Sequence, residues 1–346
     1  MDKQQIMDWA RQLCQAPGIS GRESQRGADS AAGVARRLLE PLGPVEETPL
    51  GTLICTLSQG KAGAPHLMLE AHLDQIGMTV THLEDGGFLR VANVGGIDSR
   101  LLPAMPVVIH TQEGPRPAVA ASTPPHLIEG TEKPQKITEI LIDTGYPEDR
   151  ARELFRPGDP VTMEGGFEIL GDGLMLSPAQ DDRIGCVSVL AAAHLLKEAD
   201  LDCRVSVVFA SMEEVGGQGA ATATHTLRPD RAIVVDVSFA QGFGVPKHKC
   251  GQMGGGPMIS IAPALDDAMI RQLEDLAKAQ DIPCQFEVSG GRTGTDADSV
   301  FHAADGVCTA VLSIPLRNMH TAVELVQAQD VLDVARLMAA YAKEVR

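Results

Sequence analysis

The sequence has few aromatic residues, no closely spaced pair of cysteines and few cations relative to its acids. Aromatic residues make up 3% of the chain, so the ring-lined platforms that bind sugars are scarce. The seven cysteines are scattered, without any Cys-x-x-Cys spacing. This argues against a disulfide framework and against a thiolate zinc site. We therefore expect a reducing, cytoplasmic environment.

The shortage of cations also limits the possible partners. The formal net charge is -17, whereas nucleic acids and anionic membrane surfaces are bound by clustered lysine and arginine. The N-terminal segment MDKQQIMDWARQL lacks the apolar core of a signal peptide. No apolar run reaches the roughly 18 residues that a membrane span requires. We expect neither nucleic acid nor a membrane as a partner.

The apolar runs that are present predict an α/β fold. The chain has 346 residues, of which 44% are hydrophobic, and can bury one large core or two smaller ones. Short apolar runs typical of buried strands alternate with helical patterns. Strands are expected at 53–57, 66–70, 205–210, 232–235, 258–262, 284–288 and 307–314, and helices at 4–15, 28–39, 183–199, 267–279, 297–304 and 328–345. We expect a central mixed sheet flanked by helices.

A different pattern interrupts this alternation after Asp74. Between 77 and 111, short strand-like runs are separated by Gly-Gly or proline, without a long helix. Residues 113–136 are rich in proline, glycine and charge, so we expect an exposed loop within them. The pattern predicts an α/β domain interrupted by a small β-rich domain, with bounds 1–74, 75–165 and 166–346.

The stretch from Arg204 to Gly219, RVSVVFASMEEVGGQG, is the strongest candidate for a functional site. Its apolar run leads into Glu213 and Glu214, which therefore follow the carboxyl end of a predicted strand. Ligands bind at that edge of open α/β sheets, and the glycines that follow let the backbone turn closely. A Glu-Glu pair alone is usually a solvated surface feature, so this interpretation depends on residues elsewhere in the chain.

Other metal-type ligands follow predicted strand ends or open a predicted helix. They are His72 with Asp74, Asp181 with Asp182, Asp236 and His320. Each alone has an ordinary interpretation as a core histidine, a helix N-cap or a turn residue. If they meet at one edge of the sheet, they supply the oxygen and nitrogen ligands of a pair of divalent ions.

The segments that contain these residues also carry a family resemblance. They are AHLDQIG (71–77), SPAQDDRIG (177–185), MEEVGGQGA (212–220), VVDVS (234–238), GTDAD (294–298) and IPLRNMHTAVE (314–324). They resemble the successive signatures of the tetrahedral (TET) aminopeptidases, also called the glutamyl aminopeptidase or cellulase M family. PGISGRE (17–23) and TPPHL (123–127) resemble further family segments, so the match follows nearly the whole chain in order.

The resemblance implies a role for each residue of the site. Asp181 would bridge two metal ions, with Glu213 left unligated as the general base and Asp74 orienting the imidazole of His72. The first ion would be completed by His72 and Asp236, and the second by Glu214 and His320. Asp182 would act through its peptide link to Asp181, which is often cis in relatives of this fold.

The resemblance also implies the cofactor, the substrate and the assembly. We expect two divalent ions per subunit, zinc in the first place and cobalt or manganese as alternatives. The expected substrates are peptides, and the fold is that of a dinuclear zinc aminopeptidase. The inserted domain would serve in dimerisation and as a lid, within a homo-oligomer that can be a tetrahedral dodecamer. Gln75, Gln180 and Asn318 depart from the family pattern without removing a ligand.

Several alternatives stay open from the sequence. A deacylase or carboxypeptidase could use the same metal pair, with Arg292 or Arg317 binding a carboxylate. An endoglucanase would need two carboxyls about 5 to 9.5 Å apart and no metal. A non-catalytic assembly protein could retain the scaffold. His126, His248 and His302 are interpreted as surface or packing residues, whereas Thr295 and Asp296 either form a simple turn or shape the substrate pocket.

Overall fold

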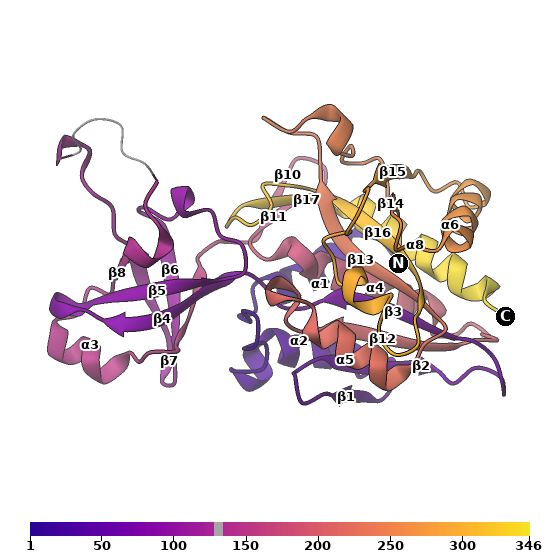
Figure 1. Ribbon diagram of the computed structural model, residues 1–346, viewed down its shortest axis with the longest axis horizontal. Helices are drawn as coiled ribbons and strands as arrows, with labels where there is room; N and C mark the ends of the chain where they lie inside the picture. Colours follow the sequence, from indigo (N-terminus) through magenta and orange to yellow (C-terminus); the bar gives the residue numbers. More distant parts are fainter. Residues whose placement is uncertain (128–133) are drawn as a thin grey trace.

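The computed structural model describes residues 1–127 and 134–346 (Figure 1). An eleven-stranded sheet with its helices forms the larger part, and a closed six-stranded barrel lies beside it. The predicted α/β fold with an inserted β-rich domain is confirmed. The domain bounds 1–74, 75–165 and 166–346 stay a prediction.

Four parallel strands form the centre of the sheet. Their order is β12 (Arg204–Ala210), β3 (His66–His72), β13 (Arg231–Phe239) and β16 (Cys308–Arg317). Every residue of β3 is buried, as expected for a strand that is covered on both faces. Because the four strands are parallel, their carboxyl ends lie at the same edge of the sheet.

Shorter strands extend the sheet on both sides. β2 pairs antiparallel with β12, β17 and β14 pair antiparallel with β16, and β15 pairs parallel with β14. Their bounds, with those of the remaining strands, are β1 (Val45–Glu47), β2 (Leu53–Ser58), β10 (Glu168–Leu170), β11 (Leu174–Ser177), β14 (Met258–Ile261), β15 (Gln285–Val288) and β17 (Glu324–Gln327).

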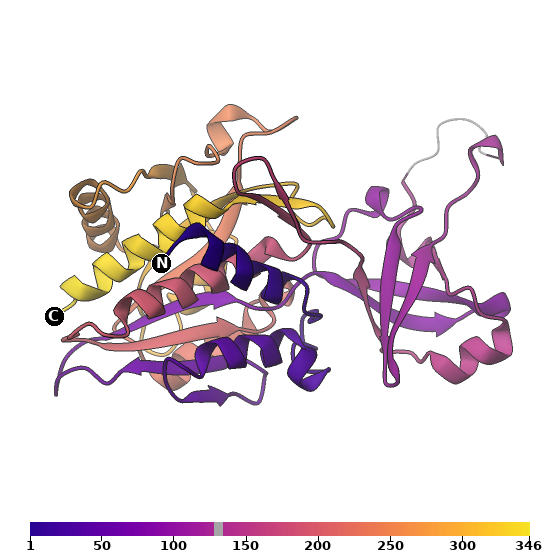
Figure 2. The ribbon, with the colours of Figure 1, turned by 180° about the vertical axis from the view of Figure 1, so that it is seen from behind.

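Helices cover both faces of the sheet. On one face, α1 (Lys3–Cys14), α4 (Gln180–Leu196) and α8 (Ala328–Glu344) pack against each other (Figure 2). On the other, α5 (Gln218–Leu227) packs against the short α7 (Ala297–Val300). None of the helices in the described ranges combines the length and the apolar content that a membrane crossing needs.

Local sequence explains where three helices begin. The side chains of Asp2, Ser30 and Asp266 each accept a hydrogen bond from the backbone N–H three residues later. They cap α1, α2 (Ala31–Leu39) and α6 (Asp267–Ala279), respectively. Such caps satisfy N–H groups that have no partner within the helix.

The barrel is a separate antiparallel unit with its own apolar core. Its order is β4-β5-β8-β7-β6-β9, and the six strand pairings that close the barrel are all antiparallel. Val80, Val91, Ile109, Ile142 and Val161 are fully buried in this core. The bounds are β4 (Gly77–Leu83), β5 (Phe88–Val94), β6 (Pro106–Thr111), β7 (Gly114–Ala120), β8 (Leu141–Asp143), β9 (Pro160–Met163) and α3 (Glu148–Leu154).

The structure adds short elements that were not expected, namely β1, β10, β11, β17 and α3, and it differs from the expectation in other places as well. Helix α5 was not predicted, since its threonines are β-branched and favour helices weakly; packing against β12 and α7 compensates. Strand β7 occupies the start of the 113–136 segment, in which a loop was expected, because it pairs with β6 and β8. The part of that loop at 128–133 lies outside the described residues. Helix α7 ends at Val300 and not at 304.

Arg183 of α4 ties the N-terminal segment to the sheet. Its side chain is fully buried, and its guanidinium donates to the carbonyls of Leu73 (3.1 Å), Leu13 (2.8 Å), Ala16 and Gly18 (3.3 Å). It thereby joins the end of α1 and the following turn to the residue after β3. Losing these donors would leave several buried carbonyls unpaired, at roughly 1 to 3 kcal/mol each.

We predict that Arg183→Met lowers the free energy of unfolding by about 3 kcal/mol or more, measured by urea denaturation. Arg271→Met is the matched control, because the Arg271 side chain on α6 is 68% exposed and surface changes stay within about 0.5 kcal/mol. Equal denaturation midpoints for the two variants would contradict the anchoring role.

Candidate active site

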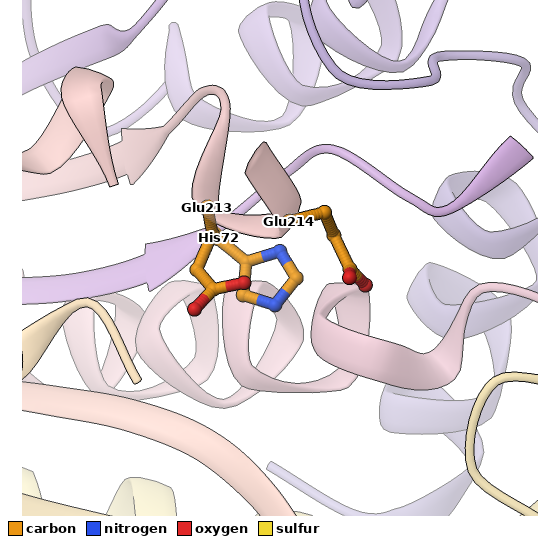
Figure 3. Close-up of side chains that lie close together, drawn as sticks. All are labelled: His72, Glu213 and Glu214. Carbon is orange, nitrogen blue, oxygen red and sulfur yellow. The ribbon is translucent and has the colours of Figure 1, made fainter. Parts of the chain in front are cut away.

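The functional residues predicted from the sequence sit at the carboxyl edge of the central strands. His72 is the last residue of β3 and pairs in register with Ala210 at the end of β12. Glu213 and Glu214 follow β12 in a short 3-10 helix, η6 (Glu213–Val215). Asp236 lies within β13 and Asp181 in the first turn of α4. Figure 3 shows the carboxyl groups of Glu213 and Glu214 directed to the same region as the imidazole of His72.

Asp181 lies between the two histidines. Its Oδ1 is 3.2 Å from Nε2 of His72, and its Oδ2 is 3.2 Å from Nε2 of His320. Nε2 of His320 is also 3.5 Å from Oε1 of Glu214. Each oxygen of the Asp181 carboxylate therefore faces a different imidazole, which is the arrangement that a bridging ligand needs. The peptide bond between Asp181 and Asp182 is cis.

Three groups of side chains can each surround a metal ion. Within each group, the ligand atoms lie within 4.8 Å of one another. The groups are His72 with Asp181 and Asp236, Asp181 with Glu214 and His320, and His72 with Glu213 and Glu214. Asp181 belongs to the first two groups and His72 to the first and third, so the groups form one continuous cluster.

Asp74 fixes the backbone of Glu213 and Glu214 through hydrogen bonds. It is fully buried, and its carboxylate accepts from the backbone N–H of Glu213 (3.0 Å), the N–H of Glu214 (3.2 Å) and the hydroxyl of Ser20 (2.5 Å). Its Oδ1 is 3.6 Å from Nδ1 of His72. Burial alone would raise the pKa of Asp74, but the His72 contact and these hydrogen bonds outweigh it and lower the pKa.

The electrostatics of the cluster favour a cation. Burial, reinforced by the nearby charge of Asp181, raises the pKa of Glu214 to about 8. Burial also raises the pKa of Glu213, and raises that of Asp236 well above its usual range. Buried carboxyls at such short separations repel each other when ionised, and bound divalent ions favour the ionised forms. The chemistry of the donor set therefore fits divalent metal ions.

Glu324 is a buried carboxylate that the sequence analysis did not assign to the site. Its Oε2 accepts from the N–H of Gln180 (2.7 Å) and of Asp181 (3.1 Å), and its Oε1 accepts from the N–H of His320 (2.8 Å). It thus holds the backbones of two ligand-type residues that are distant in the sequence. Its place four residues after His320 in MHTAVE was the available signal.

The inserted domain reaches the site through two glycines that follow β5. A Cβ added to Gly95 would lie 3.1 Å from Oε2 of Glu214, and one added to Gly96 would lie 2.9 Å from Nδ1 of His320. Gly95 also has a φ of +76°, which side chains rarely allow. The barrel domain therefore contacts the site closely through backbone that leaves no room for side chains.

A cavity of about 340 Å³ opens from the cluster. Besides ligand-type residues it is lined by Val237, Ser238, Phe239, Glu287, Thr293, Gly294, Thr295, Ser313 and Met319. Thr295 thus contributes to the cavity, whereas Asp296 is buried and does not line it. No lysine or arginine is among the described residues that line it.

The remaining candidates lie outside this cavity. Arg292 has an 88% exposed side chain and pairs at 3.4 Å with Asp298, and Arg317 donates to the carbonyl of Gln241 at 2.6 Å. His126, His248 and His302 are exposed and do not line the cavity. None of these five residues therefore lines the cavity.

Known proteins resemble the chain over almost its whole length. The family model of the M42 glutamyl aminopeptidases matches residues 51–337. A lysyl aminopeptidase of Pyrococcus furiosus is 32% identical over 348 residues, which cover 99% of this chain and 98% of that protein.

Solved structures agree with this match. An aminopeptidase from Desulfurococcus kamchatkensis has a TM-score of 0.91 at 29% identity, covering 99% of this chain and 95% of that chain. The TET1 peptidase of Pyrococcus horikoshii has a TM-score of 0.86 at 30% identity, covering 98% and 99%. That peptidase can assemble into a tetrahedron or a large octahedral shell.

The matched residues include every ligand-type side chain of the cluster, from His72 to His320. The fold, the cluster and the relatives agree on a peptide-bond hydrolase with metal-type ligands at the sheet edge. The chain belongs to the M42 glutamyl aminopeptidase family and is a metallo-aminopeptidase.

Proposed function

We propose that the protein removes N-terminal residues from peptides by using a water activated at a two-metal site, with Glu213 as the general base. The observation that carries the proposal is the position of Asp181, whose two oxygens face His72 and His320 at 3.2 Å each. When bound, two divalent ions lower the pKa of a water and polarise the peptide carbonyl. Zinc is the expected metal, with cobalt or manganese as alternatives.

The ligands divide naturally around Asp181. His72 and Asp236 would hold one ion and Glu214 and His320 the other, since each pair forms a group with Asp181. Glu213 also lies within reach of His72 and Glu214, but this division leaves it without a ligand role, and it lines the cavity. It would take the proton of the attacking water and pass it to the leaving amine. Asp74 would orient His72 and keep Glu213 in place.

The alternative functions have less support from the site. A carboxypeptidase or a deacylase of N-acylated amino acids needs a cation for the substrate carboxylate, and the described lining of the cavity includes neither lysine nor arginine. An endoglucanase would leave both histidines without a role. A non-catalytic protein would be expected to lack a ligand, and the proposed set is complete.

Assembly and location stay proposals. The TET1 peptidase supports a homo-oligomer, with a tetrahedral dodecamer as the expected form. The barrel would then serve in dimerisation and as a lid. The cytoplasmic location and peptide substrates follow from the cysteine pattern and from the family.

We predict that Glu213→Gln lowers kcat by roughly 10² to 10⁴-fold without loss of bound metal. Steady-state kinetics on aminoacyl nitroanilides, with metal analysis of the same samples, provide the measurement. Glu198→Gln is the matched control, because Glu198 is exposed and this substitution removes the same charge. A Glu213→Gln variant with the kcat of the parent would contradict the role of Glu213 as the general base.

We predict that the purified protein binds about two divalent ions per chain and that a chelator abolishes its activity until metal is restored. Asp236→Asn and Glu214→Gln should each reduce the bound metal, because each removes a charged ligand from a different side of Asp181. Mass spectrometric metal analysis decides the matter. Full activity after complete metal removal would exclude the two-metal mechanism.

A further inference from the structure

The cavity extends from the metal-type ligands across the sheet to a carboxylate on its edge. In register, Asp236 of β13 pairs with Ser313 of β16, and Ser260 of β14 pairs with Glu287 of β15. The hydroxyls of Ser260 and Ser313 lie 3.4 Å apart, so these side chains share one face of the sheet. Glu287 is thus connected to the cluster through a row of small polar side chains.

Glu287 is held in place but has no cation. Its Oε1 accepts hydrogen bonds from the hydroxyls of both Ser260 and Ser313, which are themselves buried. Among residues 1–127 and 134–346, its Oε2 has no hydrogen-bond partner, and no lysine, arginine or histidine forms an ion pair with Glu287. A half-buried carboxylate without a counter-charge is costly, so this oxygen is suited to receive a cation from a ligand.

The position of Glu287 suits the side chain of a substrate residue. Its carboxylate contacts the hydroxyl of Ser313. Ser313 pairs with Asp236 on the neighbouring strand, and neighbouring strands lie about 4.8 Å apart. The four-carbon stem of lysine and the longer side chain of arginine can bridge such a distance from a residue bound at the metal-type ligands. Phe239 and Met319 line the same cavity and offer apolar surface to the methylene groups of such a stem.

Hydrogen bonds fix the loop that contributes Thr293 and Gly294 to the cavity. Asp298 accepts hydrogen bonds from the backbone N–H of Thr293 at 2.9 Å and of Gly294 at 3.0 Å. The backbone of Thr293 and Gly294, which line the same cavity as Glu287, therefore has a set position. Neither Asp298 nor Arg292, with which it pairs, lines the cavity. Among the described lining residues, Glu287 is therefore the carboxylate that does not belong to the metal-type cluster.

We propose that Glu287 is the specificity-determining residue for the substrate's N-terminal side chain and that it selects lysine and arginine. This inference rests on the proposed aminopeptidase function. Ser260 and Ser313 position the carboxylate by donating to Oε1, and Oε2 receives the ammonium or guanidinium group. A charge-assisted hydrogen bond of this kind discriminates by roughly 10- to 100-fold against a side chain that lacks the charge.

The test compares lysyl and norleucyl nitroanilides on the metal-loaded protein, because norleucine has the same unbranched stem without the ammonium. The parent is expected to prefer lysyl by roughly 10- to 100-fold in kcat/KM. Glu287→Gln should remove most of that ratio, and Glu287→Lys should favour a glutamyl over a lysyl substrate. Glu198→Gln, at an exposed position, should keep the parental ratio.

Each outcome decides between distinct conclusions. Equal losses on both substrates in Glu287→Gln would show that Glu287 binds the α-amino group or supports the fold, and would overturn the inference. A parent that cleaves norleucyl as well as lysyl would also overturn it while leaving the aminopeptidase function intact. Absence of activity on every free aminoacyl substrate would instead remove the proposed function itself.

Discussion

The carboxylate of Asp181, placed between two histidines, is the interaction on which the rest of the site depends. His72 comes from the end of β3 and His320 from the loop after β16, so Asp181 joins opposite sides of the cluster. Glu324 accepts from the backbone N–H of both Asp181 and His320. This buried carboxylate therefore makes the two ligand-bearing segments one rigid unit, although neither of its oxygens lines the cavity.

Asp74 has the corresponding function on the other side of the cluster. It accepts from the N–H groups of Glu213 and Glu214 and faces the ring of His72. Two buried carboxylates, Asp74 and Glu324, thus set the geometry in which other carboxylates meet. Burial, together with the neighbouring carboxylates, raises the pKa values of Glu213 and Glu214, and bound cations would offset this effect. The same arrangement of buried carboxylates therefore favours the binding of divalent cations.

The two parts of the fold contribute differently to the site. The parallel strands of the α/β domain bring the ligand-type residues to one edge, whereas the barrel contributes backbone at Gly95 and Gly96, against Glu214 and His320. The cavity is lined by these ligand-type residues and also by Ser313 of β16 and Glu287 of β15. Glu287 itself comes from β15, which carries none of the ligand-type residues of the cluster.

The sequence by itself determined the α/β alternation, the β-rich insertion and the residues at the strand ends, because apolar runs and the polar residues that end them are local features. It could not show helix α5, whose threonines favour helices weakly, nor the second role of Asp74 as an anchor for η6. Only the tertiary structure brought Glu324 to Asp181, and Ser260 and Ser313 to Glu287. These contacts join residues 26 to 143 positions apart. A local sequence pattern does not show which distant residues meet, because that depends on how the whole chain folds.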